Sequence, residues 1–394
     1  MAGEAEHLAL PPRVPAYNNP HIRALFYQLL LLLALLWFGY EFWLNARDNL
    51  AAQGITSGFS FLDNTAGFGV NQSLIPYNEE DTYARVFLVG LLNTLLVAAL
   101  GIVLATILGF VIGIARLSPN WLLARLAGAY VELIRNLPLL FQILFWYLAV
   151  LGTLPGPRQS ISLFGEVFLN NRGMIVPAPV AGEGAGIVIA AFAFGVIAFL
   201  VLMHWAKRRH DRIGRQFPLL WAALALVIVL PLAVLAAQGF PIAFERPELR
   251  GFNFVGGIRL LPELVALLVA LTIYTASYIA EVVRAGILAV PRGQTEAALA
   301  LGLRRGQTLR LVVVPQALRV IVPPLTNQYL NLTKNSSLAV AVGYPDLFAV
   351  FAGTALSQTG QAIEIIAITM AVYLAISLIT SGFMNWYNAR VAVR

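Results

Sequence analysis

The sequence predicts an all-α membrane protein with about eight transmembrane helices. Hydrophobic residues make up 59% of its 394 residues, and charged residues make up only 11%. A soluble globular domain carries about a quarter charged residues, so these charges are too few to cover a water-facing surface of this size. In a lipid bilayer the outer surface is apolar instead, and each spanning helix needs about 20 consecutive apolar residues.

Eight apolar segments are candidates for such spans, and the first carries an aromatic belt. Trp37, Tyr40 and Trp43 lie toward one end of it, as amphipathic rings do at a membrane interface. No small-residue cleavage signal follows, so we expect a retained helix rather than a signal peptide. In chain order the segments are 24–44, 86–115, 128–151, 185–204, 217–237, 260–282, 311–332 and 361–383.

Two of these segments have an unusual composition. The seventh contains Pro315, Pro323 and Pro324, and membrane helices tolerate such breaks only where protein or water covers the freed backbone. We therefore expect a broken helix there. Small residues along the second segment favour close packing against another helix, with the lining of a transport path as the alternative. The small and polar residues of that segment are Gly90, Asn93, Thr94, Gly101, Gly109 and Gly113.

Basic residues predict the orientation in the membrane. If the spans alternate from an N-terminus inside the cell, most lysines and arginines fall in cytoplasmic segments, as membrane proteins generally require. The run WAKRRHDRIGR at 205–215 is the strongest single anchor. Both termini are therefore expected in the cytoplasm, and the net charge of +7 does not indicate nucleic-acid binding.

The chain lacks the common motifs of catalysis. It has no cysteine and four scattered histidines, which disfavours a metal site. It has no GxxxxGK[ST] loop to bind ATP, and without HExxH, GxSxG or paired aspartates in its spans a membrane-embedded enzyme has no support. A stand-alone secondary transporter or channel stays open as an alternative, although few acidic residues lie in the spans to form ion sites.

The longest predicted cytoplasmic loop contains a short helix. The letters QTEAALALGLRR follow a break at Pro291 and Gly293. Thr295 is expected to cap this helix, with Glu296 in its first turn. Because several apolar residues have helical spacing in a segment that lies in water, we expect a partner protein to cover them. These residues are Ala297, Ala298, Leu301 and Leu303, and Gly302 and Gly306 then allow a turn.

This loop resembles the EAA loop of importer-type ABC permeases. The match runs from Glu296-Ala297-Ala298 through Gly302 to Val312 and Val314-Pro315, with valine where the family prefers Ile and Leu. In that family the short helix docks in a groove of a separate ATPase and transmits its closure to the membrane helices. The resemblance therefore assigns ATPase coupling to Glu296, Ala297, Ala298, Gly302 and Pro315.

Other segments resemble the polar amino-acid permeases of this superfamily, namely YVELIRNLPLLFQILFWY (130–147), YIAEVVRAGILAV (278–290) and YLNLTKNSSLAVAVG (329–343). The extra first span, the inserted pair at 185–237 and the phrases GFGVNQSLIPY and FMNWYNA are similar to the Q-type permeases of general L-amino-acid transporters of Gram-negative bacteria. The resemblance implies a type I ABC importer permease fold in the bacterial inner membrane and import of polar L-amino acids.

The same resemblance implies partners and a division of the chain. The partners are a paralogous second permease, ATPase subunits that hold ATP and Mg, and a periplasmic amino-acid-binding protein; the chain itself is expected to be non-catalytic and without a cofactor. We expect an N-terminal arm, first helix and external loop at 1–85, and the first part of the permease core at 86–151. Inserted external loops and a helix pair follow at 152–257, and the second part of the core, with the coupling loop, at 258–394.

Ionisable residues in spans are functional candidates, because an unpaired charge at a helix centre in lipid costs about 3 kcal/mol on insertion scales. Glu132 with Arg135, and Glu281 with Arg284, are i, i+3 pairs near the predicted cytoplasmic boundary. We expect both to be structural ion pairs that fasten helix ends near the coupling loop, with a functional role as the alternative.

Lys334 follows the proline-containing span and is surrounded by polar residues. In other transporters, half-helix ends at mid-depth present such groups to substrates, whereas a lysine that reaches up to the interface is the alternative. Glu364, early in the last span, is a possible partner for Lys334. The candidate substrate pathway comprises Asn327, Asn331, Lys334, Asn335, Ser336 and Glu364.

Overall fold

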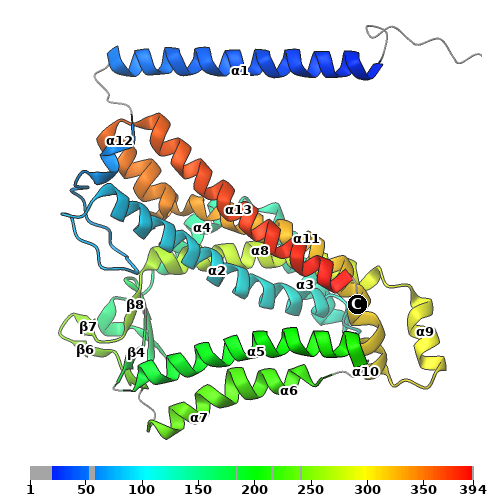
Figure 1. Ribbon diagram of the computed structural model, residues 1–394. Helices are drawn as coiled ribbons and strands as arrows, with labels where there is room; N and C mark the ends of the chain where they lie inside the picture. The colour runs from blue at the N-terminus through cyan, green and yellow to red at the C-terminus, as the bar shows by residue number, and fades with distance from the viewer. Residues whose placement is uncertain (1–19, 53–57, 183, 214–216, 240–241, 393–394) are drawn as a thin grey trace, which may run out of the picture.

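Helices dominate the structure, and the long ones run alongside one another (Figure 1). The computed structural model describes residues 20–52, 58–182, 184–213, 217–239 and 242–392. The expected N-terminal arm falls on residues 1–19, outside the described part of the chain. The α-helices are α1 (Pro20–Ala52), α2 (Tyr83–Ala115), α3 (Trp121–Asn136), α4 (Leu139–Leu144), α5 (Ala185–Ile213), α6 (Leu219–Ala223), α7 (Leu230–Ala237), α8 (Pro262–Leu288), α9 (Arg292–Ala300), α10 (Arg305–Thr308), α11 (Val314–Asn335), α12 (Leu356–Thr359) and α13 (Ala362–Ala392).

The structure also contains short 3-10 and π-helical segments, several of which extend the α-helices. The 3-10 helices are Ser60–Asp63, Pro157–Gln159 and Ser336–Val342. The π-helical turns are Phe145–Leu151, Leu224–Val229, Leu309–Val313 and Phe348–Ala355. Such π-helical turns occur mostly as short interruptions of α-helices, frequently at functional sites.

Six helices in the described part of the chain are long and apolar enough to cross a membrane. They are Ile22–Asn49, Tyr83–Ala115, Ala185–Ala206, Pro262–Leu288, Arg305–Val342 and Ala362–Ala389. The eight predicted segments all coincide with apolar helices, so the predicted polytopic helical architecture is confirmed. Two of the eight, however, are not single long helices.

The third and fifth predicted spans differ from the expectation. The third is a pair of helices, Trp121–Asn136 and Leu139–Leu151, bent by 106° and able to form a seventh crossing. Leu137 lies at the bend in an extended conformation, with φ −99° and ψ 130°, because the ring of Pro138 disfavours helical geometry in the residue before it. The fifth is the apolar helix Trp221–Ala237, which is shorter than the six long helices.

The prolines do not break α11, contrary to the prediction. Pro315 lies just after the π-helical turn Leu309–Val313 of the longer helix Arg305–Val342, and the helix also passes through Pro323 and Pro324. Ile321 and Leu325, on either side of that pair, are buried in the apolar cluster that α11 shares with α8. This packing explains why the helix continues where its own hydrogen bonding is interrupted.

The regular helix ends beyond Lys334 instead. From Ser336 to Val342 the chain forms a 3-10 helix, and Gly343 follows with a φ of 77°. Glycine adopts this left-handed conformation without strain, so it stops the helix there. The break predicted before the polar residues around Lys334 therefore lies after them.

Two inserted stretches, far apart in the sequence, join in short antiparallel sheets. One sheet has the order β1-β2-β3-β8, while β4 pairs with β5 and β6 pairs with β7. We call residues 157–181 and 242–260 the β unit. Loops were predicted here, because strands this short show too little alternation of apolar and polar residues to be recognised in a sequence. The strands are β1 (Ile161–Leu163), β2 (Val167–Asn170), β3 (Gly173–Val176), β4 (Ala178–Ala181), β5 (Ile242–Glu245), β6 (Glu248–Arg250), β7 (Asn253–Val255) and β8 (Ile258–Leu260).

A glycine allows β3 and β8 to approach closely. Gly173 has a φ of 111°, and a Cβ atom on it would lie 2.1 Å from the carbonyl oxygen of Leu260. The register pairs Ile175 with Arg259. Because β8 ends at Leu260 and α8 begins at Pro262, the sheet leads directly into a central helix and extends past the expected boundary at residue 257.

The contact between α2 and α8 is the most extensive helix pairing in the described structure. A Cβ atom on Gly109 would lie 2.6 Å from the Cβ atom of Ile279, and one on Gly113 would lie 2.8 Å from the carbonyl oxygen of Ala280. Both distances are shorter than any ordinary contact, so the helices touch through these glycines. The interpretation of the small residues as packing positions is confirmed.

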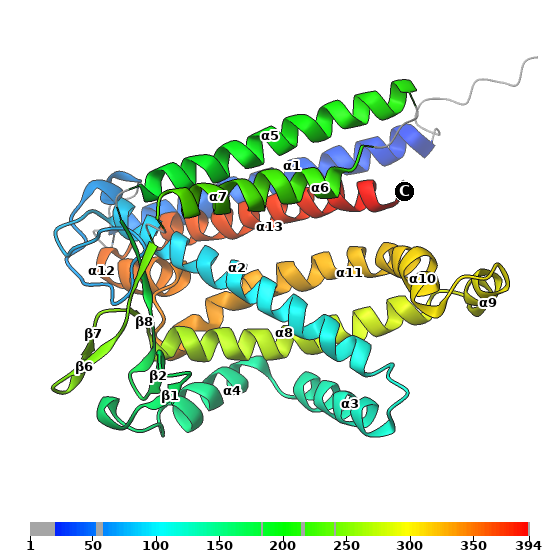
Figure 2. The same ribbon diagram turned by 90° about the horizontal axis from the view of Figure 1, so that it is seen from below.

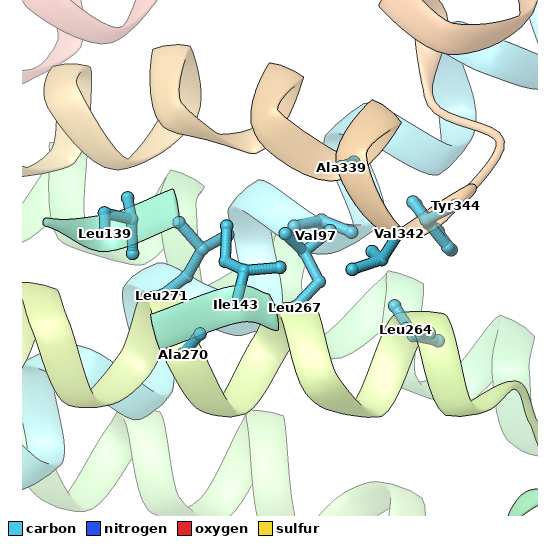
Figure 3. Packing of buried hydrophobic residues seen from close by; sticks show 10 residues of the cluster. All are labelled: Val97, Leu139, Ile143, Leu264, Leu267, Ala270, Leu271, Ala339, Val342 and Tyr344. Carbon is cyan, nitrogen blue, oxygen red and sulfur yellow. The ribbon is translucent and has the colours of Figure 1, made fainter. Parts of the chain in front are cut away.

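Figure 3 shows the apolar cluster where α2, α4, α8 and the 3-10 helix after α11 meet. Val97, Ile143, Leu267 and Leu271 are fully buried within it, and Tyr344 is buried beside Val342. In a bilayer such contacts stabilise the fold mainly through van der Waals packing, because lipid is as apolar as the side chains.

Two parts of the chain stand away from this core. None of the described side chains of α1 is buried, and Figure 1 shows α1 apart from the other helices. α5 packs chiefly on α7 and on the π-helical turn Leu224–Val229. There, a Cβ atom on Gly195 would lie 2.0 Å from the carbonyl oxygen of Leu226.

The two ends of the bundle differ in character. Figures 1 and 2 both place the β unit at one end and α9 at the opposite end. The end with the β unit is built from turns and strands, whereas α9 is a short helix held on two connecting segments.

Gly109→Ala is expected to loosen the α2–α8 contact. The added methyl group must displace Ile279, and overpacking of this kind typically costs about 1–3 kcal/mol. The midpoint of thermal unfolding of the purified protein should therefore fall. Gly128→Ala in α3 is the control, since nothing lies within 4 Å of a Cβ atom there; equal midpoints for the two variants would contradict the close contact.

Candidate functional site

The helix that carries the predicted coupling residues begins earlier than expected. Pro291, with φ −58° and ψ 136°, precedes α9, whose first residue is Arg292. The predicted N-cap, Thr295, lies inside the helix, so Glu296 falls in its second turn. This part of the prediction is wrong, because the extended Pro291 already turns the chain into the helix.

A left-handed glycine ends α9. Gly302 has a φ of 82°, and its N–H donates to the carbonyl oxygen of Leu299 at 2.9 Å. The N–H of Leu303 donates to the carbonyl oxygen of Ala298 at 3.2 Å. These two bonds form a Schellman motif, which explains the glycine. Gly306, in contrast, lies within α10 and has no left-handed φ.

The apolar side chains of α9 are largely bare in this subunit. Leu301 is 83% exposed and Leu299 42% exposed, and Ala297 is exposed as well. Ala298 is buried, on the side where α9 packs against the π-helical turn Leu309–Val313. Exposed apolar residues gathered on one short helix mark a surface for protein contact.

The remaining coupling residues lie around this helix. Glu296 is exposed and forms no ion pair with any residue that the structure describes. Pro315 lies in the first turn of α11, and a long hydrogen bond from Gln316 Nε2 to Gln294 Oε1 (3.4 Å) joins α11 to α9. α9 is therefore tied to the bundle by few contacts of its own.

One of the two predicted ion pairs is present in a larger form. Glu281 lies 2.5 Å from Arg284 on α8 and also pairs with Arg116, which follows the last residue of α2. One carboxylate thus holds two guanidinium groups from two helices. The network joins α2 to α8 on the part of α8 that leads to α9.

The other predicted pair is absent from the described structure. Glu132 and Arg135 are both exposed on α3 and form no ion pair. The Arg135 guanidinium lies over the ring of Tyr278 instead, 4.9 Å from its centroid. An aromatic face attracts a cation electrostatically, so Arg135 contacts α8 without using Glu132.

The polar residues of α11 form a stripe on one side of the helix. Asn327, Asn331 and Lys334 have the spacing of a single helical face, and all three are exposed. Asn335 is half-buried, and Ser336 is buried with its hydroxyl donating to the carbonyl oxygen of Thr333. Bare amides and a cation on a membrane helix do not suit lipid, which predicts a water-filled path or a partner subunit on this side.

A cavity of about 400 Å³ adjoins the end of this stripe. Lys334 and Ser337 line it from one side, and Tyr373 and Ser377 of α13 line it from the other. The rest of its lining is largely apolar. The cavity thus combines one cation with several hydroxyl groups in an apolar wall, which is a usual composition for a small-molecule site.

Glu364 does not join this group. Its side chain is buried at the start of α13, where Oε1 accepts a hydrogen bond from the backbone N–H of Gly58 at 2.8 Å. It forms no ion pair with Lys334 in the part of the chain that the structure describes. The suggested pairing is therefore corrected: Glu364 ties down the segment that follows α1.

Sequence reasoning missed a buried polar cluster beside the cavity. Asp346 is fully buried; its Oδ1 accepts from the backbone N–H of Ala349 at 2.8 Å, and its Oδ2 accepts from the hydroxyl of Tyr373 at 3.3 Å. Asn93 Nδ2 donates to the carbonyl oxygens of Pro345 and Gln72. The run Gly-Tyr-Pro-Asp after the seventh span was the only signal for this turn.

The segment between α1 and α2 packs on this same region. Phe61 and Tyr83 are buried together with Phe351 of the last π-helical turn. Tyr77 donates a hydrogen bond to the carbonyl oxygen of Phe68 at 2.6 Å, and burial, with the nearby carboxylates of Asp81 and Glu79, raises its pKa. The phenol therefore stays a neutral donor that holds the segment in place.

Among the described residues, no group of three or more His, Asp or Glu side chains is arranged to hold a metal ion.

The comparisons with known proteins agree with this architecture. A family model described as the binding-protein-dependent transport system inner membrane component matches residues 207–393. The chain is 54% identical over 383 residues to a putative amino-acid ABC transporter permease protein of Escherichia coli (strain K12), covering 96% of each chain. It is 51% identical over 380 residues to the general L-amino acid transport system permease protein of Rhizobium johnstonii, covering 96% of this chain and 94% of the relative.

A third relative is named for the amino acids that it transports. The chain is 43% identical over 381 residues to the glutamate/glutamine/aspartate/asparagine transport system permease protein of Rhodobacter capsulatus, with 89% of each chain covered. The chain therefore belongs to the inner-membrane components of binding-protein-dependent transport systems, and within them to the permeases of amino-acid ABC transporters.

The predicted family and the type I ABC importer permease fold are thereby confirmed. The chain is a multi-pass membrane protein, and a permease of this family is not itself catalytic. A stand-alone secondary transporter does not fit this membership.

Glu281→Gln is expected to destabilise the protein more than Glu132→Gln. The first change leaves Arg116 and Arg284 close together without their shared carboxylate, and hydrogen bonds to charged groups contribute about 1.5–3 kcal/mol each. The side chain of Glu281 is 29% exposed, so we expect the lower end of that range. Thermal unfolding of the two variants measures the difference, and a loss as large for Glu132→Gln would contradict the assignment.

Proposed function

We propose that this chain is one of two paralogous permease subunits of an ABC importer that carries polar L-amino acids into the cytoplasm. A separate ATPase would hold ATP and Mg and drive the cycle. A periplasmic binding protein would deliver the amino acid. The observation that carries the proposal is α9, a short helix at one end of the bundle where Leu299 and Leu301 are exposed in this subunit.

The coupling role of α9 rests on its shape and its attachment. Leu301 and Leu299 offer an apolar contact to an ATPase, and the Schellman motif at Gly302 fixes the direction in which the chain leaves the helix. α9 follows α8 and is separated from α11 only by the short α10 and its neighbouring turns. A movement of α9 is therefore passed directly to two membrane helices.

The orientation follows from this role. If α9 contacts a cytoplasmic ATPase, the end of the bundle with α9 faces the cytoplasm and the β unit faces the periplasm. The excess of basic residues on the side of the chain termini supports the same orientation. Both termini then lie in the cytoplasm of a bacterial inner-membrane protein.

The substrate pathway is proposed along the polar stripe of α11. Asn327, Asn331 and Lys334 would face the path enclosed with the second permease. The cavity beside Lys334 and Tyr373 is large enough for an amino-acid side chain or carboxylate. The name of the Rhodobacter capsulatus relative includes the anionic amino acids glutamate and aspartate, which supports a cation in such a place.

Reconstitution tests the proposed function as a whole. The chain is co-expressed with the products of the neighbouring genes, and the purified complex is placed in liposomes. We expect ATP hydrolysis stimulated by the amino-acid-loaded binding protein, with uptake that requires the ATPase. Uptake by this chain alone, with no ATPase present, would refute the proposal in favour of a secondary transporter.

Gly302→Ala is expected to uncouple ATP hydrolysis from uptake. A Cβ atom in the left-handed conformation costs about 1–2 kcal/mol, enough to distort the end of α9. We expect uptake per ATP hydrolysed to fall about fivefold or more, with membrane insertion unchanged. Gly306→Ala is the matched control, because Gly306 has an ordinary helical φ and open space for a methyl group.

Glu296→Ala is expected to act in the same direction as Gly302→Ala, because the exposed carboxylate has no partner within the described subunit and is free for the ATPase. The ratio of uptake to hydrolysis in liposomes is the measurement for both. Normal ratios for Glu296→Ala and Gly302→Ala together would remove the coupling role from α9.

Lys334→Met is expected to reduce uptake while leaving assembly with the ATPase intact, since it removes the one cation of the cavity without emptying the space. Lys334→Arg keeps the charge and should retain most of the uptake. Initial rates of labelled amino-acid uptake separate the two. If Lys334→Met transports like the parent protein, the polar stripe is not the pathway.

A further inference from the structure

The β unit carries a hollow that the proposed transport cycle leaves unexplained. Two cavities of about 210 Å³ each adjoin there, and both are lined by Pro157 and Arg172. Arg259 completes the lining of one cavity and Arg158 that of the other. Three guanidinium groups from separate segments of the chain therefore meet on one concave surface, which we call the arginine hollow.

These three arginines differ from the other two arginines of the β unit. Arg246 pairs with Glu166 at 2.9 Å, and Arg250 pairs with Glu248 at 3.2 Å. Arg158, Arg172 and Arg259 form no ion pair with any residue that the structure describes. The cations without a carboxylate are thus the ones that converge on the hollow.

Neutral groups hold these cations in place. The Arg158 guanidinium lies over the ring of Phe252, 3.9 Å from its centroid. Arg172 donates to the side-chain oxygen of Asn253, and Arg259 Nε donates to the carbonyl oxygen of Arg172 at 3.3 Å. The backbone N–H of Arg172 in turn donates to the buried side chain of Asn170 at 2.8 Å. These neutral contacts fix the positions of the three arginines but leave their positive charges available to a carboxylate of another molecule.

The chemistry of the hollow favours carboxylates presented by a protein. Arginine binds carboxylates bidentately and is common in protein interfaces. A free L-amino acid also carries an ammonium group, and no aspartate or glutamate lines either cavity to receive it. Two adjoining cavities with three exposed cations are instead suited to a partner protein whose surface presents several acidic side chains.

We propose that the arginine hollow is the docking surface for acidic side chains of the periplasmic binding protein. The proposal rests on the proposed function, which gives this importer a binding protein and places the β unit in the periplasm. Arg259 lies in β8, three residues before α8 begins, so the docked protein would contact the strand that leads straight into a central helix.

The test uses the assembled complex of both permeases and the ATPase in lipid nanodiscs. Its ATPase rate is titrated with the purified binding protein of the same system, saturated with a mixture of the twenty L-amino acids. For the triple variant Arg158→Gln, Arg172→Gln, Arg259→Gln we expect the half-saturating concentration to rise about tenfold or more. The basal and maximal rates should stay unchanged.

The matched control is Arg246→Gln with Arg250→Gln, which removes two arginines of the same β unit that already have carboxylate partners. Its half-saturating concentration should stay within about twofold of the parent value. Lysine at the three hollow positions keeps the charge but loses the bidentate fork of arginine, so it should restore the affinity only in part. If the triple glutamine variant does not assemble, Arg158→Gln and Arg259→Gln are titrated singly and should each weaken docking.

Several outcomes would overturn the proposal. The first is equal half-saturation for the parent and the triple glutamine variant. The second is a difference that disappears in nanodiscs of zwitterionic lipid, since the hollow would then bind anionic lipid. The third is an altered dependence of uptake on free amino acid with unaltered docking. A parent complex that shows no stimulation at all would instead refute the proposed function.

Discussion

The close contact between α2 and α8 is the constraint on which the rest of the structure depends. Glycines at 109 and 113 allow the two backbones to touch, and an α8 carboxylate, Glu281, holds the end of α2 through Arg116. α8 is 27 residues long, about 40 Å at 1.5 Å per residue. Because α2 holds it firmly, this one straight helix connects the β unit at one end of the bundle with α9 at the other.

Around that rigid centre, two surfaces lie exposed in this subunit. α9 is attached through the buried Ala298 and through a long hydrogen bond that Gln316 of α11 donates to its Gln294, and its remaining apolar surface is exposed. The stripe of Asn327, Asn331 and Lys334 is likewise exposed on α11. Under the proposed function, an ATPase would cover α9, and a second permease would enclose a water-filled path beside α11.

Much of this architecture was predictable from the sequence, because bilayer-length apolar runs and the spacing of the loop around Glu296 depend on local composition. The close packing at the α2 glycines was predictable as well, because small residues in a membrane helix favour close contact with a neighbouring helix. The break at Gly343 and the ion pair from Arg116 were not predictable, since they depend on which helices become neighbours. Lys334 and Glu364 looked like partners in the sequence, but the fold directs Glu364 to the backbone of Gly58.

The pairing of β4 with β5 has a consequence for how this chain is put together. Ala181 and Ile242 are cross-strand neighbours, so everything between them leaves and re-enters the structure at a single point. The helices α5, α6 and α7, which lie between these two strands in the sequence, pack chiefly on one another. A tight reverse turn in their place would close the same pair of strands, because segments that leave and re-enter a structure at one point are where insertions are tolerated.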